Sequence, residues 1–176
     1  MIPEPLHPAI VHFPIVLLLL GAPIAIIAIF VRRWHLPWLA ALVITAGAVG
    51  AIAATWTGND EEEMVGEISQ RADSILDEHE DWGERTRNVA IFAVVLAIIA
   101  AGLTKLPVPS IAVGVLCAIT SIGAAVCVAQ AGHYGGLLVY KHGVGINTAA
   151  GANASDPGSV KSDLTKKDKK DDDDDD

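Results

Sequence analysis

The residues of this chain with the clearest chemical potential are its six histidines, because neutral imidazole is a common ligand for metal ions and for haem iron. We expect four of them to act as ligands. These four are His7, His12, His79 and His142. His12 is the sharpest case, since we place it a full turn inside hydrocarbon, where a polar side chain is costly unless it is paired, ligated or faces a cavity. We expect His35 and His133 to be interfacial residues without a ligand role.

The spacing of the first two candidates favours two neighbouring centres over one small ion. His7 and His12 are five positions apart, which on a helix turns their side chains ~140° from each other. Side chains that project from facing helices are a standard way to hold haem. We therefore expect a b-type haem protein that transfers electrons, with one haem or two, and with His12 paired to His79 or His142. On this hypothesis His12→Ala loses at least one haem and His35→Ala loses none.

Two alternatives stay open. The same imidazoles could bind copper or another transition metal directly, or the chain could be a non-catalytic structural subunit of a membrane complex. A haem also needs a gap between helices lined by small residues, but such residues serve close helix packing equally well. The sequence has no P-loop, H-E-x-x-H, G-x-S-x-G or G-x-G-x-x-G motif, so it favours an electron carrier or binding subunit over an enzyme.

Four apolar stretches must position these histidines. Hydrophobic residues make up 52 % of the chain and are concentrated in blocks, at about residues 8–31, 37–57, 88–104 and 110–130. Each block is near the ~20 residues with which a helix crosses ~30 Å of hydrocarbon. Because lipid cannot pair backbone polar groups, the blocks predict an all-α, integral membrane four-helix bundle in contact with the lipid bilayer. This bundle is expected to form one domain over residues 1–147.

The distribution of charge predicts how the bundle is oriented. Arg32 and Arg33 follow the first span and Lys105 follows the third, whereas residues 58–87 hold eleven acidic residues against three arginines. By the positive-inside rule, the two short loops are cytoplasmic and both termini lie outside. We expect a multi-pass protein of the bacterial inner membrane, with most of its histidines at the outer face. The acidic outer segment is suited to dock a basic redox partner, and we expect no nucleic-acid partner.

Two further segments are expected to cover the outer end of the bundle. Residues 60–82 carry apolar residues at helical spacing, which predicts an amphipathic helix between the second and third spans, with His79 on its apolar stripe. We expect this helix to run on into the third span, with a kink at Gly83. Residues 131–146 contain five glycines, so we expect them to turn and fold back, bringing Tyr140 and His142 towards the centre. Residues 148–176 end in a run of aspartates and predict a disordered acidic tail.

Two of these segments also carry a resemblance to a known family. HPAIVHFP at residues 7–14 and GGLLVYKHGVG at residues 135–145, with W-T-G at residues 56–58, resemble the predicted membrane-protein family called domain of unknown function 2231. The resemblance covers about residues 5–147 and implies a four-helix membrane domain without an established activity. Related proteins are often joined to, or found beside, c-type cytochrome modules. The resemblance therefore favours a redox role by association. We expect a c-type cytochrome or another redox partner at the outer face, and a chain that acts as a subunit of a larger complex or as a homo-oligomer.

Overall fold

The computed structural model describes residues 7–31, 35–62 and 68–144, and for residues 61 and 62 it describes the backbone only. Within these ranges all regular structure is helical. The helices are α1 (His7–Ile10), α2 (His12–Phe30), α3 (Leu36–Glu62), α4 (Gln70–Gly102) and α5 (Pro107–His142), with a 3-10 turn at Leu103–Lys105. The continuous stretch of α1 and α2, and each of α3, α4 and α5, is long and apolar enough to cross a membrane. The predicted all-α bundle with four spans is confirmed.

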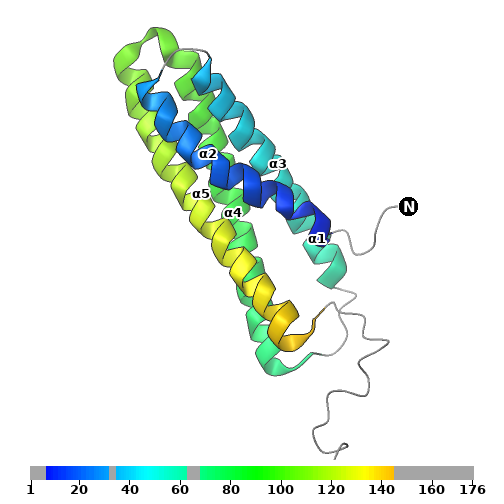
Figure 1. The fold of residues 1–176 in the computed structure, drawn as a ribbon. Coiled ribbons are helices and arrows are strands. Elements are labelled where there is room, and N and C mark those ends of the chain that lie inside the picture. Colours follow the sequence, from blue (N-terminus) through cyan, green and yellow to red (C-terminus); the bar gives the residue numbers. More distant parts are fainter. Residues whose placement is uncertain (1–6, 32–34, 63–67, 145–176) are drawn as a thin grey trace, which may run out of the picture. The chain divides into compact units, whose positions relative to one another are not determined.

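The four long helices lie side by side, and each packs against two neighbours (Figure 1). α2 packs against α3 and α5, and α4 packs against the same two helices. α1 precedes α2, separated from it by a break at Val11, and packs against α3. Pro14 contributes to this break, because it has no N–H to donate to the carbonyl of Ile10.

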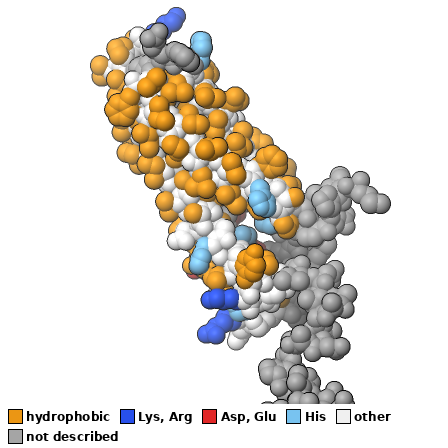
Figure 2. Space-filling model, in the orientation of Figure 1, with side chains coloured by type: hydrophobic (Ala, Val, Ile, Leu, Met, Phe, Trp, Pro, Cys, Tyr) orange, Lys and Arg blue, Asp and Glu red, His pale blue; other side chains and the backbone are white. Residues whose placement is uncertain are grey.

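Small side chains fill the interior of the bundle, and large apolar side chains cover its outside. Ala90, Ala93 and Ala124 are 0 % exposed, whereas Phe30 and Leu42 are 80 % and 66 % exposed. Figure 2 shows apolar side chains over most of the visible face, with lysine and arginine side chains near its two ends. This distribution is the reverse of that in a water-soluble protein, and it suits helices that pack closely within lipid.

Two glycines of α3 show what the small residues of the second span do. A Cβ atom at Gly47 would lie 2.9 Å from Cδ2 of Leu18, and one at Gly50 would lie 3.0 Å from Cδ of Pro14. α2 therefore approaches α3 more closely at these positions than any larger residue would allow. Of the two uses of small residues that the sequence left open, close helix packing applies here.

The third long helix begins well before its apolar span. α4 starts at Gln70, with the Ser69 hydroxyl as its N-cap, and runs without interruption to Gly102. Residues 70–82, which we predicted to belong to an amphipathic helix between the second and third spans, are therefore the first part of α4. Of the rest of that predicted helix, residues 60–62 belong to α3 and residues 63–67 lie outside the described residues, as does the predicted tail at 148–176.

The prediction that residues 131–146 turn back over the bundle was wrong for the part that the structure describes. α5 continues as a helix through its glycines to His142 and ends at Gly143, whose φ of 66° lies in the left-handed region that glycine adopts readily. Tyr140 is 91 % exposed rather than central. A glycine costs a helix only about 1 kcal/mol relative to alanine, and the packing of α5 along α4 outweighs that cost.

Candidate functional site

One end of the bundle gathers two of the predicted ligands, and we call it the histidine end, defined by His7, Gly58, His79 and Gly135. His7 is the first residue of α1 and reaches across to α3. Its Nδ1 lies 2.9 Å from the backbone carbonyl oxygen of Ala54, 47 positions further along the chain. One helical turn after this carbonyl, Gly58 lies against the ring, and a Cβ atom there would be 3.1 Å from the Cε1 atom of His7.

His79 makes the same arrangement with the other pair of helices. It lies in α4, and its Nδ1 is 2.8 Å from the backbone carbonyl oxygen of Ala131 in α5. Gly135, again one turn beyond the carbonyl, lies against the ring, and a Cβ atom there would be 3.0 Å from the Cε1 atom of His79. Each imidazole thus rests on a neighbouring helix, between a carbonyl that accepts its hydrogen bond and a glycine that leaves room for it.

The two rings also meet each other. The centroids of the His7 and His79 rings are 5.9 Å apart, and their planes are 86° apart, close to perpendicular. Both side chains are half-buried. The structure therefore brings together two of the four predicted ligands at a point where both pairs of helices meet.

The hydrogen bonds decide which ring nitrogen can act as a ligand. A carbonyl oxygen can only accept, so Nδ1 of His7 and of His79 must each carry a proton when the ring is neutral. The lone pair is then on Nε2, the nitrogen that binds metal in this tautomer. In both rings Nε2 is the ring nitrogen further from the glycine, 3.9 Å and 3.8 Å from the Cβ positions at Gly58 and Gly135. Metal-binding histidines almost always donate their second N–H to a carboxylate, a carbonyl or water, and this pair has that feature.

The separation of the rings is compatible with a single metal between them. At metal–nitrogen bonds of about 2.0–2.1 Å, two imidazoles on opposite sides of one metal have their centroids roughly 6 Å apart. The observed centroid separation of 5.9 Å is close to that value. Among the residues that the structure describes, no group of three or more His, Cys, Asp or Glu side chains could hold a metal ion. A metal at His7 and His79 would therefore need further ligands beyond the described side chains.

The other two predicted ligands lie apart from this pair. His12 is exposed on α2, and His142 is the half-buried last residue of α5. Within the described ranges, neither ring has a hydrogen bond or a contact with another aromatic ring. His133 is exposed and packs edge to face on Tyr134, with 5.6 Å between the ring centroids. His35 precedes α3 at the opposite end of the bundle.

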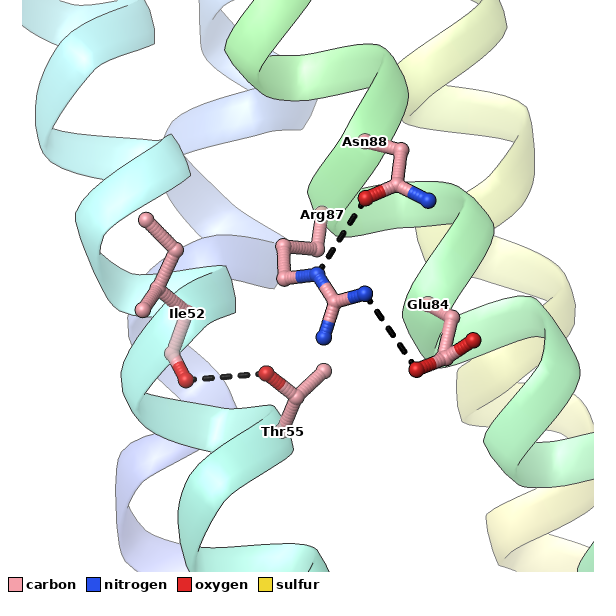
Figure 3. A network of polar contacts seen from close by, with 5 residues as sticks. All are labelled: Ile52, Thr55, Glu84, Arg87 and Asn88. Carbon is pink, nitrogen blue, oxygen red and sulfur yellow. Dashed lines mark hydrogen bonds and ion pairs between the residues drawn. The ribbon is translucent and has the colours of Figure 1, made fainter.

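A charged network lies on the side of α4 that faces α3, one to three helical turns after His79 (Figure 3). Nη2 of Arg87 donates to Oε1 of Glu84 at 3.2 Å, and Nε of Arg87 donates to Oδ1 of Asn88 at 3.2 Å. On the α3 side, the Thr55 hydroxyl is turned to its own helix and donates to the carbonyl of Ile52. The contacts of Arg87 stay within α4, so the network offsets the charge of an arginine that is only 27 % exposed.

Sequence reasoning missed the role of Gly58 and Gly135. The available signal was a repeated spacing: Ala54 precedes Gly58 and Ala131 precedes Gly135, each by four positions. Four positions is one helical turn, so the alanine carbonyl and the glycine lie on the same face of the helix. Without knowledge of which histidine faces which helix, this spacing looks like ordinary small-residue packing.

Comparison with known proteins addresses the fold and leaves the site open. The model of the family described as predicted membrane protein, domain of unknown function 2231, matches residues 3–148. The chain belongs to this family. No curated protein and no solved structure matches the chain. The family description supports a membrane protein and assigns it no activity.

Proposed function

We propose that this chain is a membrane electron carrier that binds a b-type haem between His7 and His79. The observation that carries the proposal is the convergence of the two imidazoles, each with Nδ1 held by a backbone carbonyl. In this tautomer the lone pair of each ring is on Nε2, the nitrogen that would bind the haem iron. Haem, when bound, supplies a one-electron redox centre, while the chain's own residues supply the axial ligands and fix their orientation.

The ligand count favours haem over a bare ion. A haem brings four nitrogens of its own and needs two axial ligands, which is the number of imidazoles that converge here. A copper ion held by side chains alone usually needs a third protein ligand. No such third ligand lies beside the pair within the described residues. His12 and His142, the other two predicted ligands, are kept as candidate ligands of a second haem.

The setting of the site suggests how such a carrier would work. We propose that the protein lies in a bacterial inner membrane with the histidine end outside, and that it passes electrons between the membrane quinol pool or a complex and an acceptor at that face. Acidic side chains are exposed along the first part of α4, close to His79 in the chain. They are Asp73, Asp77, Glu78 and Asp81. Their charge would steer a basic redox partner, such as a c-type cytochrome, towards the histidine end.

An absorption spectrum of the purified protein tests the proposal. We expect a Soret band and α and β bands that sharpen on reduction. His7→Ala and His79→Ala should each lose these bands, because each removes one axial ligand. His133→Ala is the matched control, since His133 lies at the same end of the bundle and is exposed. A colourless protein with stoichiometric copper would favour the metal-ion alternative, and a colourless, metal-free protein of full stability would leave only the structural-subunit alternative.

A further inference from the structure

The two halves of the chain repeat one another around the histidine pair. A shift of 72 positions takes His7 to His79, and the same shift takes Phe30, the last residue of α2, to Gly102, the last residue of α4. A shift of 77 positions takes Ala54 to Ala131 and Gly58 to Gly135. Each half is thus a hairpin of two helices, in which the first supplies a histidine and the second supplies its carbonyl and glycine.

The residues that are buried in the two hairpins follow the same two shifts. Four of the five buried residues of α2 become buried residues of α4 when they are moved by 72 positions. The four pairs are Pro14 and Thr86, Leu18 and Ala90, Gly21 and Ala93, and Ala25 and Ala97. The fifth, Ala22, becomes the half-buried Val94.

The second helices of the two hairpins agree in the same way. Of the seven buried residues of α3, six become buried residues of α5 when they are moved by 77 positions. The six pairs are Ala40 and Cys117, Ala41 and Ala118, Ile44 and Ser121, Gly47 and Ala124, Ala51 and Val128, and Ala54 and Ala131. The two hairpins therefore turn equivalent faces towards the interior, as the packing of α2 and α4 against the same two neighbours requires.

We infer that the chain is a twofold repeat built around one metal centre, with Gly58 and Gly135 as equivalent positioning residues for the two ligands. This inference rests on the proposed function and adds three statements to it. The His7–His79 pair holds one haem per chain. The two ring planes are 86° apart, each fixed by its own helix, so the imidazoles would hold a haem iron with their planes near perpendicular. Each glycine acts on the metal only through the ring that lies against it.

Replacement of the glycines by alanine tests this arrangement with a built-in control. A methyl group at residue 58 or 135 would come within 3.1 Å or 3.0 Å of Cε1 of the ring, so the imidazole must shift. Gly136 is the control, because nothing lies within 4 Å of its Cβ position and it neighbours Gly135 in α5. Alanine raises helix propensity by about 1 kcal/mol at all three positions, so the folding of the helices is not put at risk.

The experiment measures haem content per chain, haem affinity, the low-temperature EPR spectrum of the oxidised protein and the reduction potential. We expect one haem on the pair, and the strongly anisotropic low-spin signal that near-perpendicular axial imidazoles give. Gly58→Ala and Gly135→Ala should each weaken haem binding about 10- to 100-fold, as changes to the partners of a metal ligand do. Both should also alter the EPR signal and the potential, while Gly136→Ala leaves all four measurements unchanged.

The outcomes separate this inference from the proposed function. The twofold site would be overturned if haem binding changed in only one of the two glycine variants. It would also be overturned if His7→Ala lost two haems together. In both cases the proposed haem-binding function would remain. An EPR signal of parallel imidazoles would do the same. A wild-type protein that takes up no haem would remove the proposed function and this inference with it.

Discussion

The imidazoles of His7 and His79 lie with 5.9 Å between their centroids and with their planes 86° apart, although 72 positions separate them in the chain. Nδ1 of each ring donates a hydrogen bond to a backbone carbonyl of the next helix in its own hairpin. The contact between the rings is consequently a contact between the two halves of the protein. A ligand at this point would be held by both halves at once.

His12 provides a test of where the centre is. It is five positions from His7 but is exposed on α2, and among the described residues it makes no hydrogen bond or ring contact with the pair. We expect His12→Ala to keep the haem of the His7–His79 pair and its spectrum. Haem per chain, measured together with His7→Ala, checks this. If His12→Ala lost the same haem as His7→Ala, the assignment of His7 and His79 as the ligand pair would be wrong. If His12→Ala lost a different haem, the protein would have a second haem site.

Gly50 provides a test of the close approach of α2 to α3. A methyl group there would lie 3.0 Å from Cδ and 3.2 Å from the backbone nitrogen of Pro14, and a proline ring cannot swing aside. We expect Gly50→Ala to lower the free energy of unfolding by about 1–3 kcal/mol, the usual cost of overpacking. Thermal denaturation in detergent measures this. At Gly114 the nearest atom would be 3.6 Å away, so Gly114→Ala serves as control and should be neutral or stabilising by up to about 1 kcal/mol.

The orientation of the bundle can be measured by labelling single cysteines. Lys105 and the arginine pair at 32–33 are the charges of the two short connections, so we expect these connections to be cytoplasmic. In a background in which Cys117 and Cys127 are replaced by alanine, a cysteine at residue 62 should react with a membrane-impermeant reagent on intact cells. A cysteine at residue 107 should react only after the membrane is opened. The reverse pattern would place the histidine end in the cytoplasm.

The four spans could be predicted from the sequence because the length and apolar content of each block match what a membrane-crossing helix requires. Sequence reasoning also anticipated that the helix before the third span runs into that span, but it misplaced the end of α5. The charged residues before Asn88 mark where α4 leaves an apolar setting, but they do not end its helix, which starts at Gln70. In α5, Gly135 and Gly136 suggested turns, yet backbone hydrogen bonding and packing against α4 carry the helix through them to His142.

The contact between His7 and His79 could not be predicted from the sequence, for a related reason. We predicted that His12 pairs with His79 or His142 because of its depth in the membrane, and that ligand pairing stays a prediction. Which histidine faces which helix depends on how the helices are rotated about their axes. The hydrogen bonds that record this rotation join residues 47 and 52 positions apart. No local pattern in the sequence contains that information.

The two histidine–carbonyl hydrogen bonds, one within each hairpin, have a consequence for how the protein is inserted into the membrane. His7 meets Ala54 within the first hairpin, and His79 meets Ala131 within the second, so neither ligand needs the other half of the chain in order to be oriented. As the chain enters the bilayer, the first hairpin can be complete before the second has been synthesised. Each hairpin can thus orient its own histidine before the two hairpins meet, and the contact between the two imidazoles forms only when the hairpins pack together.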